Sequence, residues 1–144
     1  MKNNYACIGL FNPKSPENIG SVMRAAGCYG VNSVFYTGTR YDLAKPFYTD
    51  TQKAIEAIPL IGVNNLKEVI PLGCVPVAVE LIDGAKPLTT YKHPARAFYI
   101  FGPEDGTLKK EITGFCDDIV YIPTEGCMNL AATVNVVLYD RLAK

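Results

Sequence analysis

Short apolar runs of strand length alternate along the chain with segments whose apolar residues recur at helical spacing. The strand-like runs lie at 5–11, 33–37, 75–81, 97–101 and 119–122. The helix-like segments lie at 16–30, 64–70, 108–115 and 128–143. Strands that alternate with helices in this way predict an α/β fold, in which helices cover both faces of a mostly parallel sheet.

The first helix has a clear start and a clear apolar face. Ser15, Pro16 and Glu17 offer a capping hydroxyl, a proline for the first helical position and an acid in the first turn. Ile19 belongs to the apolar face of this helix, whereas Arg24 lies about 140° away from Ile19 around the helix axis. We therefore expect Arg24 to point away from the core.

Two loops near the C-terminal end predict a ligand site. Residues 101–106 and 121–130 each follow a strand-like run, contain glycine and proline, and lead toward a helix-like segment. In open α/β sheets small molecules bind beyond the carboxyl ends of the strands, where such loops meet. The two loops are therefore expected to form one pocket.

Length and composition favour one globular domain, residues 1–144, because 49% of the residues are hydrophobic and 19% are charged. No stretch approaches the roughly 18 consecutive apolar residues of a membrane helix, so we expect a cytoplasmic protein that does not bind membranes. The five cysteines are scattered and no pair has CxxC spacing, and His93 is the only histidine. We therefore expect reduced thiols and no metal site.

The formal net charge is zero, which argues against binding to nucleic acid by overall charge alone. Residues 1–55 nevertheless hold six Lys and Arg against three Asp and Glu, and the remainder of the chain holds eight against eleven. The segment 38–51 is long for a connection and carries Arg40, Tyr41 and Lys45. These side chains suit RNA phosphates and unpaired bases, but they also suit an aromatic lid packed on this domain or on a second subunit.

Familiar nucleotide and hydrolase motifs are missing. No G-x-G-x-x-G follows the first strand, and neither G-x-x-x-x-G-K-[ST] nor G-x-S-x-G occurs. These absences weaken NAD-dependent, P-loop and serine-hydrolase interpretations. A Rossmann-type enzyme with another nucleotide cofactor is disfavoured for the same reason.

Three segments in order resemble the motifs of the SpoU (TrmH) family of RNA 2′-O-ribose methyltransferases, within the SPOUT superfamily. They are NIGSVMRAA at 18–26, FGPEDGTL at 101–108, and the run 122–140 with its Ile-Pro, Met-Asn-Leu and Tyr-Asp pieces. One such motif alone is weak, but three in the right order are specific. With no added N-terminal RNA-binding domain, the chain is similar to the minimal, TrmL-type members, which modify the wobble nucleotide of tRNA.

The resemblance implies a homodimer that binds S-adenosylmethionine in a C-terminal trefoil knot and methylates a ribose of RNA, with tRNA favoured over rRNA. The knot rests on the family alone, since general topology rules exclude knots. The implied cofactor-binding residues are Glu80, Gly102, Pro103, Glu104, Ile122, Cys127, Met128 and Leu130. A non-catalytic RNA-binding relative with the same fold is the alternative.

The resemblance also implies that Arg24, with Asn18 and Asn129, belongs to the catalytic site. A guanidinium is practically always protonated, so Arg24 is a poor base. Our hypothesis is that Arg24 holds the neighbouring phosphate and stabilises the developing alkoxide. The plainer interpretations are a solvated cation for Arg24 and helix caps for the two asparagines.

Two positions depart from the family pattern. Cys127 and Ala131 stand where many relatives have serine. A thiol is a weak hydrogen-bond donor and alanine donates nothing. A mechanism that needs those hydroxyls is therefore in doubt, whereas cofactor binding through the backbone is not.

Overall fold

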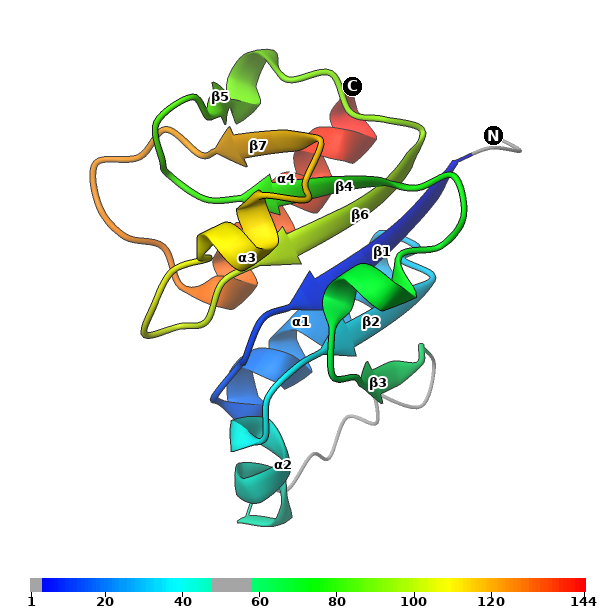
Figure 1. Cartoon of the computed structure of the whole chain (residues 1–144), viewed down its shortest axis with the longest axis vertical. Coiled ribbons are helices and arrows are strands. Elements are labelled where there is room, and N and C mark those ends of the chain that lie inside the picture. Colours follow the sequence, from blue (N-terminus) through cyan, green and yellow to red (C-terminus); the bar gives the residue numbers. More distant parts are fainter. Residues whose placement is uncertain (1–3, 48–57) are drawn as a thin grey trace.

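A sheet of seven parallel strands runs through the part of the chain that the computed structural model describes, residues 4–47 and 58–144 (Figure 1). Its strand order is β3-β2-β1-β6-β4-β7-β5. The strands are β1 Tyr5–Leu10, β2 Ser33–Tyr36, β3 Leu60–Gly62, β4 Val75–Val79, β5 Lys86–Pro87, β6 Arg96–Phe101 and β7 Asp118–Tyr121. The helices are α1 Pro16–Cys28, α2 Arg40–Ala44, α3 Lys110–Thr113 and α4 Leu130–Ala143, with 3₁₀ segments at Lys45–Phe47, Leu66–Val69 and Leu88–Thr90.

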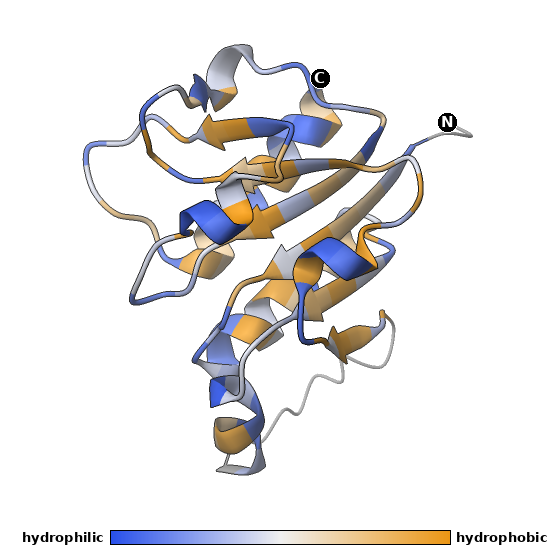
Figure 2. Cartoon of the chain, viewed as in Figure 1, coloured by the Kyte–Doolittle hydropathy of each residue, from blue (hydrophilic) through white to orange (hydrophobic). Residues whose placement is uncertain are grey.

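Two apolar layers sandwich the sheet. Side chains of β1 and β6 alternate between them, so that Ile8 and Tyr99 face α1 and α4, whereas Phe98 and Ile100 face the opposite side. In Figure 1, α1 and α4 lie behind the sheet and α3 lies in front of it. Figure 2 shows that the strands are mostly hydrophobic, while α3 is largely hydrophilic on its outer side. The predicted α/β class, with helices on both faces, is confirmed.

The main elements agree with the sequence pattern, and the short ones differ. The helix predicted at 108–115 shrinks to α3, because Lys109 at its N-cap gives no side-chain cap bond and Gly114 ends it. The segment predicted as a helix at 64–70 is a 3₁₀ turn, capped by the side chain of Asn65. Strand β5 was not predicted, since its two residues carry no apolar run. The connection at 38–51 contains α2, and its part beyond 47 lies outside the described residues.

The sheet topology brings three strand ends together. β6 lies between β1 and β4, with Leu10 opposite Phe101 and Val79 opposite Phe101, and β4 pairs with β7 through Val79 and Val120. The chain adds β2 and β3 on one side of β1 and then returns to build β4, β6 and β7 on the other. Such a switch of direction is where open α/β sheets hold ligands.

Candidate cofactor and active site

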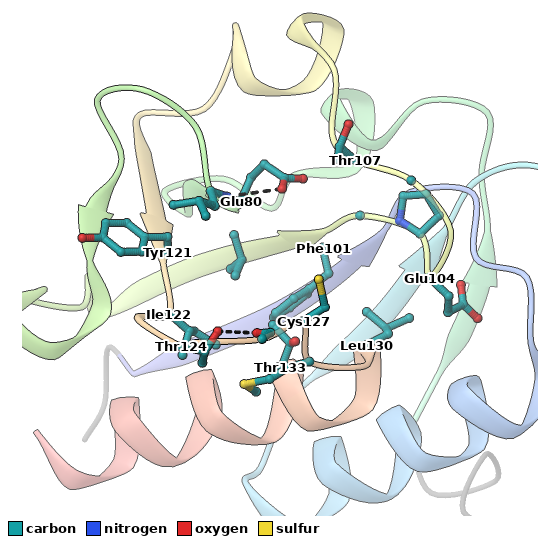
Figure 3. Close-up of a pocket in the computed structure, with 17 residues that line it drawn as sticks. Glu80, Phe101, Glu104, Thr107, Tyr121, Ile122, Thr124, Cys127, Leu130 and Thr133 are labelled. Carbon is teal, nitrogen blue, oxygen red and sulfur yellow. Dashed lines mark hydrogen bonds between the residues drawn. The ribbon is translucent and has the colours of Figure 1, made fainter.

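A cavity of about 340 Å³ opens beyond the carboxyl ends of β4, β6 and β7 and reaches the start of α4 (Figure 3). All eight predicted cofactor residues line it, together with others that the sequence did not single out, such as Thr107, Thr124 and Thr133. In Figure 3, Glu80 and Thr107 lie on one side, and Thr124 and Cys127 lie on the other, next to α4. The predicted residues are thus brought together, and their role as cofactor ligands stays a prediction.

Glu80 fixes the loop at Leu108, which borders this cavity. Its Oε2 accepts the backbone N–H of Leu108 at 2.8 Å, and its Oε1 accepts the N–H of Leu81 at 3.2 Å. Gly102 lies beneath that contact: a Cβ there would stand 3.3 Å from the Leu108 nitrogen and 3.5 Å from Glu80 Oε2. A larger residue at position 102 would therefore press on the bond that shapes the loop.

Glu104 lines the cavity but directs its carboxylate toward α1. It accepts the backbone N–H groups of Lys14 at 3.0 Å and Ser15 at 2.8 Å, and the side-chain amide of Asn18 at 3.3 Å. Ser15 in turn caps α1 by accepting the N–H of Asn18, as the sequence predicted. Asn18 therefore connects the first motif to the second. It does not line the cavity itself, but it contacts Glu104, which does.

Asn129 serves as the N-cap of α4. Its side-chain oxygen accepts the N–H of Ala132 at 2.7 Å, and its carbonyl accepts the hydroxyl of Thr133 at 2.9 Å. The loop before it is fixed by the hydroxyl of Thr124, which donates to the carbonyl of Gly126 at 2.6 Å. Capping thus accounts for the Asn129 oxygen, and its role in catalysis stays a prediction.

As far as the structure describes the chain, the cavity lining contains two carboxylates, those of Glu80 and Glu104, and no lysine, arginine or histidine. This charge pattern suits a ligand that carries positive charge. It also means that the lining offers no histidine or lysine to take a proton.

Arg24 lies on the exposed side of α1, as its angular position predicted. Within the described part of the chain its side chain has no hydrogen bond or ion pair, and Arg24 does not line the cavity. A single chain therefore does not bring Arg24 to the cofactor cavity.

The predicted RNA-binding residues, which lie in α2 and directly after it, make contacts within the chain. Arg40 forms a two-pronged ion pair with Asp105, at 2.8 and 3.0 Å, and donates to the carbonyl of Asn12 at 2.6 Å. The hydrogen bond from Arg40 holds the pKa of Asp105 below its ordinary value. Tyr41 is buried, and Lys45 pairs with Asp42 at 3.3 Å. Burial of Tyr41 agrees with the alternative of an aromatic lid packed on this domain. RNA binding by Arg40, Tyr41 and Lys45 stays a prediction.

Sequence reasoning missed the pair of Arg40 and Asp105, since the residues are 65 positions apart and no local pattern connects them. It also missed the lining threonines, although Thr107 belongs to the second motif. Among residues 4–47 and 58–144, no three or more His, Cys, Asp or Glu gather as metal ligands would, and none of the helices has the length and apolar content to span a membrane.

The cavity at the ends of three parallel strands defines the class of protein, an α/β protein with a ligand-sized cavity at a topological switch point. Within that class the chain belongs to the SpoU rRNA Methylase family, whose model matches residues 5–139. The family predicted from the three motifs is thereby confirmed.

Known relatives agree with this assignment. The chain is 26% identical over 137 residues to the 23S rRNA (guanosine-2′-O-)-methyltransferase RlmB of Nitrosomonas europaea. This match covers 88% of the chain and 52% of the relative. It therefore spans about half the length of that relative. The fold matches the A. aeolicus TrmH/SpoU tRNA modifying enzyme with a TM-score of 0.81, at 20% identity, over 96% of this chain and 74% of that one.

A further fold match extends over nearly the whole of both chains. It is to a structure that gives insights into the 2-OH methylation of C/U34 on tRNA, with a TM-score of 0.75 and 20% identity. The match covers 97% of this chain and 95% of that one.

Proposed function

We propose that this protein is an S-adenosylmethionine-dependent RNA 2′-O-ribose methyltransferase. The observation that carries the proposal is the convergence of the family motifs: residues of the second and third motifs line one cavity, and Glu104 links that cavity to the first motif through the side chain of Asn18. When bound, the cofactor supplies an electrophilic methyl group on a sulfonium. We keep the C-terminal trefoil knot as part of the prediction.

The chain's own residues fit such a cofactor. Glycine-rich backbone at Gly102 and Gly126 leaves room for close approach of a nucleoside, and the apolar side chains of Ile122 and Leu130 offer it a surface. The carboxylates of Glu80 and Glu104 favour a ligand with positive charge. These residues would bind and orient the cofactor rather than move protons.

The role proposed for Arg24 is to hold the phosphate next to the target ribose and to stabilise the developing alkoxide. Because Arg24 lies away from the cavity of its own chain, this role requires either a large movement of α1 or a second subunit. The rigid anchoring of α1 to Glu104 favours the second subunit.

A homodimer provides that second subunit. α1 and α4 pack side by side on the same face of the sheet, so their outer sides form one surface. On α4 that surface exposes 38% of Val136, 60% of Tyr139 and 70% of Leu142. Apolar side chains that are grouped on one helix face are typical of subunit interfaces. We propose that this face forms the dimer and carries Arg24 toward the partner's cavity.

We propose tRNA as the substrate, in the cytoplasm. The relative concerned with C/U34 of tRNA has nearly the same length as this chain, and the chain spans only about half of the RlmB relative. The identity to both relatives is low, and rRNA is therefore the alternative. A non-catalytic RNA-binding protein of the same family is the second alternative.

The test combines a cellular and an in vitro measurement. Nucleoside mass spectrometry of tRNA and rRNA from cells with and without the gene should show loss of one 2′-O-methylnucleoside in tRNA. Purified protein should transfer labelled methyl groups from S-adenosylmethionine to RNA from the deletion strain. An unchanged nucleoside profile together with no methyl transfer would favour the binding protein, and loss of a nucleoside from rRNA would favour the rRNA substrate.

A further inference from the structure

A second cavity, of about 610 Å³, lies at the opposite end of the sheet and of α4 from the cofactor cavity. The 3₁₀ segment Leu88–Thr90, the loop that follows it, the start of the described chain at Asn4 and the last turn of α4 enclose it. Three cations line it, Lys92, Arg141 and Lys144. Among the residues that the structure describes, none in its lining is acidic.

Arg141 brings a positive charge that pairs with no carboxylate of residues 4–47 or 58–144. Its guanidinium donates to the carbonyls of Pro94 at 2.6 Å and Ala95 at 2.7 Å, to the hydroxyl of Tyr99 at 3.0 Å, and to the side chain of Asn4. All of these acceptors are neutral. The contacts hold the guanidinium firmly at the cavity wall and leave its charge available to an anion.

The other two cations add to that charge. Lys144 pairs with Asp140 at 2.8 Å, and Asp140 is also bonded to His93 at 2.7 Å. Lys92 is exposed and has no bonding partner within the described part of the chain. Three cations against one carboxylate leave a local formal charge of +2 while His93 is neutral, in a chain whose total is zero.

We propose that this cavity binds a phosphate group of the RNA substrate, outside the nucleotide that is methylated; the proposal rests on the function proposed above. RNA affinity needs local clusters of cations here, because the net charge is zero and Arg40 and Lys45 are paired with aspartates. The threonine hydroxyls of Thr89 and Thr90 add hydrogen-bond donors for phosphate oxygens.

The position of the cavity agrees with a flanking phosphate. Leu130 lines the cofactor cavity and Arg141 lines this one, and the rise of the helix separates them by about 16 Å. The cavity also avoids the proposed dimer face, since Arg141 follows Tyr139 by two residues and so lies about 200° round the helix from it. A dimer through Tyr139 therefore leaves the cavity open.

His93 provides a direct reporter of this cavity, because it is the only histidine of the chain. A carboxylate only accepts hydrogen bonds, so His93 Nε2–H donates to Asp140 and Nδ1 accepts the hydroxyl of Tyr99, at 2.7 Å. Arg141 and Lys144 are the cations that face this group. An anion in the cavity offsets them and raises the pKa of His93, which one imidazole resonance reports in an NMR titration.

The experiment compares Lys92→Gln with the matched control Lys67→Gln, in which an exposed lysine outside the cavity is changed. The affinity for a short labelled single-stranded RNA is measured by anisotropy over a range of salt concentrations. Removing one phosphate contact should flatten the slope of log K against log[salt] by about 0.7 and weaken binding about fivefold at 0.1 M salt. RNA should raise the His93 pKa in the unmodified protein and less so in Lys92→Gln.

Equal affinities for the Lys92→Gln and unmodified proteins, or equal losses in both variants, would overturn the proposal. So would a His93 resonance that moves with inorganic phosphate but not with RNA, which would indicate a small-anion site. Cofactor binding and methyl transfer by the unmodified protein are measured in parallel. If these are absent the proposed function fails, whereas intact methyl transfer with unaltered RNA binding by Lys92→Gln removes only the phosphate site.

Discussion

The carboxylate of Glu104 accepts the backbone N–H of Ser15 at 2.8 Å. Glu104 belongs to the loop that lines the cofactor cavity, and Ser15 is the N-cap of the helix that carries Arg24. The bond therefore fixes the entry of α1 against the cofactor loop. The same carboxylate group therefore belongs to a residue of the cavity lining and anchors the helix that carries Arg24.

Replacing Glu104 with alanine should lower both the stability of the fold and the affinity for the cofactor. The substitution removes the acceptor of the Lys14 and Ser15 N–H groups and should lower the free energy of unfolding by about 2 kcal/mol. Glu104→Gln keeps an acceptor oxygen and should lose less than half of that. Urea unfolding and calorimetric cofactor titration measure the two effects, and equal losses in both variants would assign the role to charge rather than to hydrogen bonding.

Arg40 is expected to act as a positioning residue for the cofactor loop. Its ion pair with Asp105 ties the start of α2 to the residue that follows Glu104, and its bond to Asn12 ties it to the loop before α1. Arg40→Ala and Asp105→Asn should therefore raise the KM for S-adenosylmethionine severalfold while kcat changes little. Steady-state kinetics at saturating RNA measure this split.

The double variant separates positioning from RNA contact. If Arg40 acts through Asp105, adding Asp105→Asn to Arg40→Ala should cost little more than either change alone. The salt slope of RNA affinity should stay as in the unmodified protein. A flatter slope for Arg40→Ala would instead return Arg40 to the RNA-binding role first predicted for it.

The sequence predicted the long elements and the two loops of the cavity, because both leave local signals, whereas the individual cofactor residues came from the resemblance to the family. Ser15 and Pro16 mark the start of α1, and glycine and proline mark the loops that follow β6 and β7. The predicted residues converge because carboxyl ends of neighbouring parallel strands meet at one edge, and this convergence needs only the order of strands and helices.

Long-range electrostatic pairs leave no such signal. Arg40 was predicted to meet RNA, and its partner Asp105 becomes a neighbour only when β1, β2 and β6 lie side by side. Arg141 and His93 form their network in the same way, across 42 to 47 residues. The partners of such charged residues therefore have to be assigned from the fold, since composition cannot tell a paired cation from a free one.

Arg24 should matter for turnover and not for cofactor binding. Arg24→Ala removes the proposed donor to the phosphate and the alkoxide and should lower kcat by about 10²- to 10³-fold. Arg24→Lys restores the charge without the two-pronged geometry and should recover only part of the rate. Single-turnover methyl transfer measures the rate, and calorimetry should give an unchanged affinity for S-adenosylmethionine because Arg24 lies outside the cavity. Full activity of Arg24→Lys would rule out the geometric requirement.

His93 should make the protein less stable at mildly acidic pH. Burial holds the pKa of His93 below its ordinary value of 6.5, and the opposing bond to Asp140 only partly offsets that effect. The unfolded chain therefore binds more protons than the folded chain as the pH falls below about 6.5, and the free energy of unfolding decreases there. Thermal melts between about pH 5.5 and 7.5 should show this decrease, and His93→Gln, which keeps the two hydrogen bonds, should show a flatter profile.

The proposed dimer can be tested on the exposed face of α4. Leu142→Asp puts a charge among the exposed apolar residues and should weaken dimerisation at least tenfold, which corresponds to about 1.5 kcal/mol of lost apolar burial. Leu72→Asp is the matched control, because Leu72 is 96% exposed and lies outside both α1 and α4. Sedimentation velocity should give a monomer for the first variant and the unaltered species for the second.

Since Arg24 reaches no cavity within its own chain, the monomeric variant should also lose methyl transfer while it still binds the cofactor. A monomer with full activity would show that Arg24 acts without a second subunit. A movement of α1 would then have to bring Arg24 to the cavity of its own chain.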